Sequence, residues 1–439
     1  MEALNPARLP LDRYPEALSL QDLEPVRPLR ICLLGYRSHP YGGGQGVYLR
    51  YLSKALLELG HRVDVISGPP YPHLDPRVRL IEMPSMNLYE TGLLSLRPRH
   101  LRSLSNIIEW LSKLTGGFAE PQAFGRRALR YLREHRGDYD IVHDNQSLSY
   151  GMLALQRAGV PLVTTIHHPI TSDLRLALAA CRWWWPRLLT RRWHSFLGMQ
   201  KRVARGLRHV VTVSECSRGD IARDFGLPAE RLTLVHNGVD TEVFAPDAGV
   251  ARKPLQLMAT ASADQPLKGL AVLLNAFAAL LPAHPGLRLL VVGKPRPGGD
   301  TEKLIARLDL GAHIDFVSGI STAELVRLYR ESTLVVVPSL YEGFGLPASE
   351  AMACGAPVVS SDGGALPEVV GDAGVLVPAG DETALAGAIA ALLADPARRT
   401  ELGQRARARM STLFCWRRAA RQMTHYYEQV LAGDGNRQS

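Results

Sequence analysis

Short apolar runs alternate with helical patterns along most of this sequence, and that alternation limits the possible folds more than any other feature. Residues 30–35 (RICLLG) have the composition of a buried strand, and apolar residues recur at helical spacing across 47–59. Gly60 ends this helical pattern, and 62–67 begins the next apolar run. Repetition of this strand–helix–strand unit predicts an α/β fold of parallel sheets covered by helices on both faces.

The predicted strands fall into two groups. In the first half they continue at 78–83, 140–143, 161–166, 209–214 and 232–236. In the second half they lie at 255–261, 287–293, 313–317, 334–338, 357–361 and 375–378. Residues 239–254 between the groups lack periodicity and contain turn formers, which indicates a linker.

A chain of 439 residues is about twice as long as one hydrophobic core usually organises. We therefore expect two doubly wound, Rossmann-like domains facing across a cleft, with ligands at the carboxyl ends of the strands. The predicted parts are an N-terminal arm (1–28), a first domain (29–238), the linker (239–254), a second domain (255–398) and C-terminal helices (399–439) that return to the first domain.

Composition excludes several classes of protein. With 46% hydrophobic and 21% charged residues the chain is globular, and no apolar run reaches the roughly 18 residues of a membrane-spanning helix. The first 28 residues hold five prolines and no apolar segment, so a secretion signal is not expected. Five widely spaced cysteines without a CxxC pair indicate a reducing cytosol and no structural metal.

The positive charge is concentrated in one segment. Residues 174–214 contain nine Lys or Arg and no acidic residue, and four of the six tryptophans lie there. Arginine and tryptophan together favour the headgroup zone of an anionic membrane; the alternative is a helical hairpin whose tryptophans fill a crevice between domains. No nucleic-acid-binding module is recognised. Within the predicted insertion 174–208, the residues assigned to membrane or acceptor contact are Trp183, Trp184, Trp185, Arg187, Arg191, Arg192 and Trp193.

Two loops carry the pattern of a ligand site. Residues 36–46 (YRSHPYGGGQG) join a strand to a helix, where glycines let backbone amides approach a phosphate or simply form a tight turn. Residues 341–355 (YEGFGLPASEAMACG) place Glu342 in a loop and Glu350 early in a helix, and Gly363 and Gly364 follow the next strand. The carboxylate of Glu350 could have no role beyond a favourable interaction with the helix dipole. That explanation does not apply to Glu342, which lies in the loop. Together the loops predict a pocket for a hydroxyl-rich, phosphate-bearing ligand.

The seven-residue spacing between Glu342 and Glu350 resembles the EX7E segment of the retaining glycosyltransferases of family 4, which have the GT-B fold. Other segments match that family in order: GGGQGVYLRYLSKALLELGHRVDVI, DIVHDNQ, TTIHHP, VTVSE, VHNGVDTEVF and PLKGL. The resemblance covers about residues 29–395. It implies a GT-B fold and transfer of a sugar from a nucleoside-diphosphate-sugar.

The resemblance also implies residue roles. His167, Glu342 and Lys268 would be catalytic; His167 matches the histidine near the reacting carbon, although a histidine packed at a strand end is the alternative. Glu350 would hold the ribose hydroxyls, and Lys268 would neutralise the diphosphate. The implied donor-binding positions are Gly43, Gly44, Lys268, Phe344, Gly345, Leu346 and Glu350, with the backbone contributing at 344–346.

Two further features concern charge at the diphosphate. The family usually has an arginine five residues before the lysine, where this chain has Ala263, and Lys294 or Arg37 are the candidate substitutes. Asp138 and Asp140 form a DxD pattern, but they precede a buried strand, so we expect Asp140 to cap or turn the chain and predict neither a metal ion nor a cofactor.

We therefore expect a metal-independent, retaining glycosyltransferase that uses a nucleotide-sugar donor. The hypothesis for its acceptor is a lipid-linked molecule at an anionic membrane surface, with the protein cytoplasmic and peripheral on the inner face of the membrane. Two alternatives remain open: a nucleotide-sugar 2-epimerase on the same architecture, and a non-catalytic sugar- or membrane-binding relative.

Overall fold

The computed structural model describes residues 27–40, 44–93, 96–181, 183–261 and 265–435. These residues form two compact units. Of the described residues, the N-terminal unit contains those up to His236 together with those from Ala419 onward, and the C-terminal unit contains Asn237–Arg418. The boundary falls at the start of the predicted linker, and residues 239–254 belong to the C-terminal unit.

The N-terminal unit is built on a seven-stranded parallel sheet with the strand order β3-β2-β1-β4-β5-β6-β7. Ile31 in the central strand pairs with Val63 on one side and with Ile141 on the other. Most side chains of the inner strands are buried, as expected for a sheet covered on both faces. The strands are β1 (Arg30–Gly35), β2 (Arg62–Ser67), β3 (Arg79–Glu82), β4 (Ile141–Asn145), β5 (Leu162–Ile166), β6 (His209–Thr212) and β7 (Leu232–Leu234).

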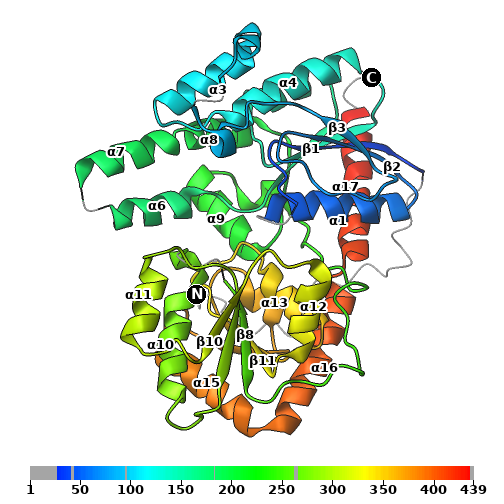
Figure 1. Ribbon diagram of the computed structural model, residues 1–439. Coiled ribbons are helices and arrows are strands. Elements are labelled where there is room, and N and C mark those ends of the chain that lie inside the picture. The colour runs from blue at the N-terminus through cyan, green and yellow to red at the C-terminus, as the bar shows by residue number, and fades with distance from the viewer. Residues whose placement is uncertain (1–26, 41–43, 94–95, 182, 262–264, 436–439) are drawn as a thin grey trace. The chain divides into compact units, whose positions relative to one another are not determined.

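Helices cover both faces of this sheet (Figure 1). Their buried stripes supply the core, for example through Leu49, Leu52 and Leu56 of the first helix. They are α1 (Gly44–Glu58), α2 (Leu88–Thr91), η4 (Pro98–Arg102), α3 (Leu104–Leu114), α4 (Glu120–Glu134), α5 (Tyr150–Arg157), α6 (Thr171–Ala180), α7 (Trp184–Trp193), α8 (Phe196–Gly206), α9 (Glu215–Phe225) and η5 (Ala229–Arg231).

The C-terminal unit is built on a six-stranded parallel sheet with the order β10-β9-β8-β11-β12-β13. Its strands are β8 (Gln256–Thr260), β9 (Arg288–Val292), β10 (Ile314–Val317), β11 (Leu334–Val337), β12 (Val358–Ser361) and β13 (Val375–Val377). Its helices are η6 (Pro266–Lys268), α10 (Leu270–Leu280), α11 (Asp300–Arg307), α12 (Thr322–Glu331), α13 (Leu346–Ala353), α14 (Leu366–Val370), α15 (Glu382–Ala394) and α16 (Pro396–Leu413).

The C-terminal helices divide between the units, which corrects the prediction that all of 399–439 returns to the first domain. Helix α16 stays with the C-terminal unit, where Arg407 donates to the carbonyl groups of Thr241, Phe244 and Ala353. Helix α17 (Trp416–Gly435) belongs from Ala419 onward to the N-terminal unit. Buried hydrogen bonds tie it there, including one of 2.9 Å between His61 Nε2 and Thr424 Oγ1.

Two parallel, Rossmann-like sheets confirm the predicted fold class, and each predicted strand corresponds to an observed one. In each sheet the strand order reverses next to the first strand, between β1 and β4 and between β8 and β11. Open α/β sheets bind ligands at such switch points, outside the carboxyl ends of the strands. The loops that follow β1, β4, β8 and β11 are therefore the places to look for a site.

Candidate functional site

An ion pair joins the loops that follow β8 and β11 in the C-terminal unit. Lys268 Nζ lies 2.8 Å from Glu342 Oε1, and the Ser339 hydroxyl donates to the same carboxylate oxygen at 2.8 Å. The Glu342 side chain is 10% exposed, whereas the Lys268 side chain is 29% exposed. The buried Glu342 carboxylate thus positions Lys268 at the switch point, and part of the lysine side chain remains accessible to a ligand.

Close backbone packing fixes this pair. Gly269, directly after Lys268, has a φ of 64°, and a Cβ there would collide with the carbonyl oxygen of Pro338. The Leu340 amide donates to the Leu267 carbonyl at 2.8 Å. Because Gly269 has no side chain, the loop that contains Lys268 packs directly against the loop that contains Glu342.

The glycine turn after β12 supports Glu342 from a third side. Gly364 has a φ of 67°, and a Cβ on it would collide with the Glu342 backbone. The Ala365 amide donates to the Glu342 carbonyl at 2.9 Å. Three loops at the carboxyl edge of this sheet thus form one packed cluster, which contains Lys268, Ser339 and Glu342.

Glu350 lies in α13 and forms a separate polar cluster. Its carboxylate accepts a hydrogen bond of 3.1 Å from the Tyr329 hydroxyl, which lies 3.0 Å from Thr260 Oγ1 at the end of β8. Burial raises the pKa of Glu350 to about 7, an effect that the Tyr329 hydrogen bond only partly offsets. This carboxyl group therefore changes protonation state near neutral pH.

The segment 344–346 offers its backbone rather than its side chains. The Phe344 ring is buried and packs 5.9 Å, between centroids, from Phe414. Gly345 adopts a φ of 101°, and Leu346 begins α13. The first amides of a helix are available to an anion, so this segment has the geometry that phosphate binding through the backbone requires.

His167 follows β5 in the N-terminal unit and is held by the loop after β4. Its Nε2 lies 2.6 Å from Asn145 Oδ1. Gln146 clamps the neighbouring backbone, because its Oε1 accepts from the His167 amide at 2.7 Å and its Nε2 donates to the His168 carbonyl at 2.8 Å. The histidine is thus a positioned side chain at the carboxyl edge of the sheet.

A buried network lies behind His167. The Tyr48 ring meets the imidazole edge-on with centroids 4.7 Å apart, and the Tyr48 hydroxyl lies 3.2 Å from Thr165 Oγ1. Thr165 is 2.7 Å from His143 Nε2, and His143 Nδ1 is 2.6 Å from the Tyr427 hydroxyl of α17. Burial lowers the pKa of His143 and of His167 to about 3, so both are neutral at pH 7.

The glycine-rich loop is described only in part. Gly43 lies outside the described residues. Gly44 begins α1, and no atom of the described residues lies within 4 Å of the place where its Cβ would be. Gly46 packs so closely on the His39 carbonyl that a Cβ would not fit. The helix start therefore leaves room for a ligand beside Gly44.

The candidates for a second cation differ. Ala263 lies outside the described residues. Arg37 is held by two acids, at 2.9 Å from Glu90 and at 3.3 Å from Glu120. Lys294 is exposed just after β9, the neighbour of β8, and has no ion pair with any residue that the structure describes. Lys294 is therefore the better placed substitute.

The DxD pattern lies at the amino end of β4, whereas His167 follows the carboxyl end of β5. Asp140 directly precedes β4, and Arg30 of β1 binds its carboxylate at 2.8 Å, so Asp140 forms an ion pair between neighbouring strands. Among the residues described, no group of three or more His, Cys, Asp or Glu side chains could hold a metal ion. Likewise, none of the described helices is both long enough and apolar enough to cross a membrane.

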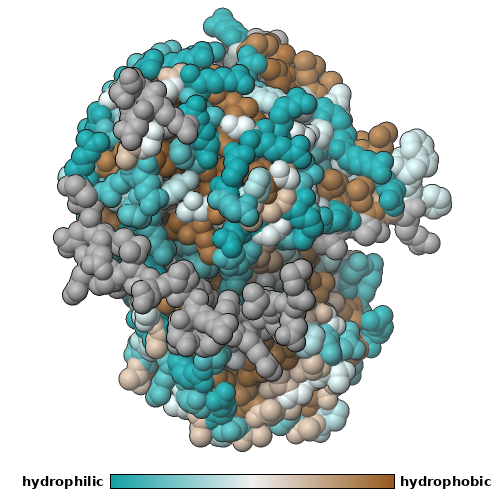
Figure 2. Space-filling model, turned by 180° about the vertical axis from the view of Figure 1, so that it is seen from behind, coloured by the Kyte–Doolittle hydropathy of each residue, from teal (hydrophilic) through white to brown (hydrophobic). Residues whose placement is uncertain are grey.

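The tryptophans of the basic segment divide into two sets. Trp183, Trp184 and Trp185 are 67%, 76% and 56% exposed. Trp193 is half-buried, with its ring centroid 5.1 Å from that of Phe118 and Lys113 Nζ 4.9 Å from it. Figure 2 shows the projecting α6–α7 region at the right edge of the view, where hydrophobic side chains gather.

The segment that follows helix α3 contacts α7. Arg192 of α7 donates to Thr115 Oγ1 at 2.7 Å, and a Cβ on Gly116 would contact Leu189. Most of the exposed large hydrophobic side chains of the described protein lie on or beside these two helices. This set, which we call the apolar ridge, comprises Leu104, Leu111, Leu114, Trp183, Trp184, Trp185, Leu188 and Leu189.

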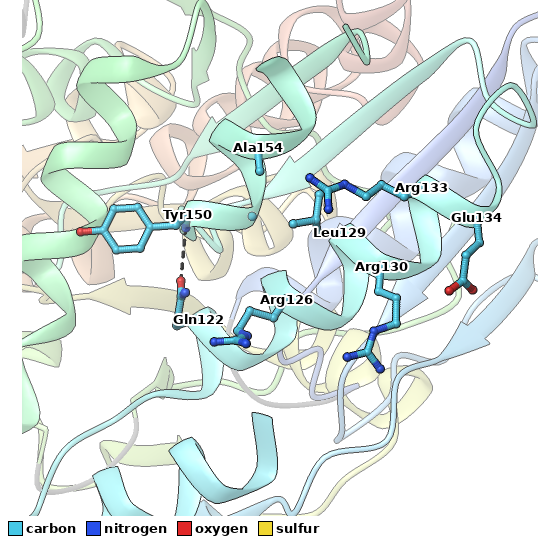
Figure 3. A pocket seen from close by; sticks show the side chains of 9 residues that line it. Gln122, Arg126, Leu129, Arg130, Arg133, Glu134, Tyr150 and Ala154 are labelled. Atoms are coloured by element: carbon cyan, nitrogen blue, oxygen red, sulfur yellow. Dashed lines mark hydrogen bonds between the residues drawn. The ribbon is translucent and has the colours of Figure 1, made fainter. Parts of the chain in front are cut away.

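A groove of about 590 Å³ between α4 and α5 contains none of the predicted site residues (Figure 3). Arg126, Arg130 and Arg133 line it along one face of α4, opposite Tyr150 and Ala154 of α5. The three arginines are exposed, as on an ordinary solvated helix face.

Sequence reasoning missed several polar partners. Asn145 and Gln146 lie in the DIVHDNQ segment, which signalled them as a motif without indicating their contacts. Tyr48 likewise lies in a segment that matches the family, whereas Ser339 and Tyr329 carried no pattern of their own. Their roles depend on which strands and helices are neighbours in space.

Comparison with known proteins identifies relatives of both units. The family description "Glycosyltransferase Family 4" matches residues 42–243, and "Glycosyl transferases group 1" matches residues 248–409. The MMP α-(1→4)-mannosyltransferase of Mycolicibacterium hassiacum is 46% identical over 92% of this chain and 99% of its own length. A D-inositol 3-phosphate glycosyltransferase of Acidothermus cellulolyticus is 30% identical over 93% and 92% of the two chains.

Solved structures share the fold. Sucrose-phosphate synthase from Thermosynechococcus elongatus superposes with a TM-score of 0.71 at 27% identity, over 93% of this chain and 100% of that one. HepE from Anabaena, solved in complex with UDP, has a TM-score of 0.67 at 19% identity, over 91% and 100%. These neighbours confirm the predicted GT-B architecture.

Proposed function

This chain belongs to glycosyltransferase family 4, and we propose that it transfers a mannosyl group from a nucleoside-diphosphate-mannose to an acceptor hydroxyl with retention of configuration. The choice of mannose is supported by the relative at 46% identity, which is named an α-(1→4)-mannosyltransferase. The observation that carries the proposal is the cluster of Lys268, Ser339 and Glu342 at the switch point of the C-terminal sheet. A partly exposed cation there suits a leaving diphosphate.

The residues of the C-terminal unit divide the work of holding the donor. Lys268 neutralises charge on the diphosphate, and the amides at 344–346 hydrogen-bond to phosphate oxygens. Glu350 accepts hydrogen bonds from the ribose hydroxyls, and Glu342 keeps Lys268 in place and faces the sugar. Lys294 supplies the second positive charge in place of the usual arginine.

In the reaction, the bond from the anomeric carbon to the phosphate oxygen breaks, and a bond to the acceptor oxygen forms on the same face of the sugar. The acceptor's proton moves to the departing diphosphate, so no enzymic nucleophile is required. An α-configured nucleotide-mannose then gives an α-linked product, as in the name of the relative. Lys268 and the helix amides stabilise the charge that develops on the leaving group.

Positive side chains and helix amides at the phosphates also make a divalent ion unnecessary, so we propose metal-independent turnover. Activity should survive an excess of chelator. Loss of turnover in chelator that manganese or magnesium restores would contradict this part of the proposal.

The apolar ridge supports a membrane-side acceptor, with the protein peripheral on the membrane. The segment 183–191 contains three exposed tryptophans and two exposed leucines. Arg187 and Arg191 in the same segment are also exposed. Anionic headgroups attract the arginines, and the apolar side chains gain burial in the bilayer boundary. A lipid-linked acceptor would thereby reach the enzyme at the membrane surface.

The proposed activity is tested by incubating the protein with a panel of nucleotide-sugars, with and without glycan acceptors. We expect release of nucleoside diphosphate from a mannose donor only when an acceptor is present. Formation of a C2 epimer from the donor alone would favour the epimerase, and binding without turnover would favour a non-catalytic relative. Lys303→Ala, a change at an exposed lysine of α11 outside the proposed donor-binding residues, serves as the control for the Lys268→Ala variant.

A further inference from the structure

The orientation of the Asn145 amide follows from its two partners. Its Nδ2 donates to the Gln45 carbonyl at 3.1 Å, and a carbonyl oxygen can only accept. The Oδ1 atom must therefore be the one that faces His167 Nε2 at 2.6 Å. Because an amide oxygen can only accept, Nε2 of the histidine carries the proton.

The other ring nitrogen of His167 is left as an acceptor. A neutral imidazole with its proton on Nε2 has a lone pair on Nδ1. Within the part of the chain that the structure describes, no residue is recorded as hydrogen-bonded to Nδ1, whereas Nε2 is fully used. The Tyr48 ring and the Gln146 clamp restrain the ring and the backbone, so this lone pair has a fixed direction.

The charged and titratable groups around His167 keep it neutral. Burial disfavours a positive charge on it most strongly, and the adjacent His168 and His143 of β4 would each oppose that charge when protonated. Tyr48 of α1 contributes only its ring edge. Asn145 adds no charge, whereas an aspartate at that position would stabilise the imidazolium form.

We propose that Asn145 is a positioning residue that holds His167 in the Nε2-protonated, neutral form, so that Nδ1 accepts a hydrogen bond from a hydroxyl group of the transferred sugar. The role of the sugar hydroxyl rests on the proposed transferase function. The tautomer of His167 does not, because it follows from protein contacts alone.

The tautomer is tested on the intact wild-type protein by NMR of ¹⁵N-labelled histidine, with His167→Gln to assign the signals. We expect the two ring nitrogens of His167 to differ strongly at pH 7, with the proton on Nε2. A proton on Nδ1, or an imidazolium, would overturn the proposal. If the tautomer is as expected and no sugar is transferred with any donor, the proposed function fails and the assignment of Asn145 stands.

The isosteric variant Asn145→Asp tests the consequence for the reaction. Its carboxylate should raise the pKa of His167, so Nδ1 becomes protonated as the pH falls and turnover at pH 6 should drop roughly tenfold relative to pH 8. All rates are measured at saturating donor, so that the pH dependence of nucleotide binding does not affect them. Under these conditions wild type, and the matched control Asn106→Asp on α3 of the same unit, should show no such limb. A pH profile for Asn145→Asp identical to that of wild type would contradict the positioning role.

Discussion

Lys268 and Glu342 form an ion pair of 2.8 Å although they are 74 residues apart in the chain. They meet because β8 and β11 are neighbours in the sheet and because Gly269 lets their following loops touch. The pair defines a role for Glu342, which holds in place the lysine whose exposed surface would face the diphosphate.

The first prediction concerns the cations at the diphosphate. Lys268→Ala should weaken donor binding by at least about tenfold, because a charge-assisted hydrogen bond contributes roughly 1.5–3 kcal/mol. Lys294→Ala should weaken it less, and Ala263→Arg should strengthen it by restoring the usual second cation. Calorimetric titration with nucleoside diphosphate measures each affinity, with Lys303→Ala as the control. Equal affinities in all these variants would refute the assignment of both lysines.

The second prediction concerns the pH dependence of nucleotide binding. Glu350 must be ionised to accept two ribose hydroxyls well, and burial raises its pKa to about 7. Nucleotide affinity should therefore fall as the pH drops below about 7, by up to tenfold per unit. Glu350→Gln should bind weakly and lose this dependence. A pH-independent affinity in wild type would exclude the ribose role.

The same group has a consequence for stability. The pKa of Glu350 in the folded protein lies above the ordinary value of 4.5, so between about pH 4.5 and 7 the folded state binds a proton that the unfolded state has lost. The free energy of unfolding therefore falls as the pH rises through this range. Glu350→Gln removes this cost. Its melting temperature should exceed that of wild type at pH 8 and match it near pH 4.5, as thermal unfolding at the two pH values would show.

The third prediction concerns the helix that returns to the N-terminal unit. Tyr427→Phe removes the hydroxyl beside His143 Nδ1 and leaves a buried polar atom without its partner, which should cost about 1–3 kcal/mol of folding stability. The matched variant Tyr150→Phe changes an exposed tyrosine and should cost much less. Thermal unfolding of the two variants measures the difference, and Tyr427→Phe should have the lower melting temperature. Equal melting temperatures would show that the hydrogen bond of Tyr427 does not contribute to folding stability.

The fourth prediction concerns the apolar ridge. Wild type should sediment with vesicles that contain anionic lipid and be partly released by high salt. A variant with Trp183, Trp184 and Trp185 changed to Ser should stay in solution while binding nucleotide normally. Tyr150→Ser combined with Val243→Ser, which removes exposed apolar groups elsewhere, should behave as wild type. If wild type binds no vesicle composition, the membrane hypothesis is wrong and the acceptor is a soluble molecule.

The sequence predicted the strands and the two-domain organisation well, because a buried parallel strand is an uninterrupted apolar run between turn residues. It also indicated Glu342 and Glu350 as loop and helix positions. It could not show that Glu342 binds Lys268 while Glu350 binds Tyr329, since those pairs depend on the order of strands and helices in space. It assigned α16 to the first domain because a helical pattern alone does not show which surface its arginines bind.

The central claim is transfer of mannose with retention. The most direct measurement is the anomeric configuration of the first product, followed by ¹H NMR immediately after the enzyme is mixed with an α-configured nucleotide-mannose and an acceptor. We predict that the first glycoside formed is the α-anomer, and that Lys268→Ala forms it far more slowly than Lys303→Ala. A β-linked first product would contradict transfer with retention.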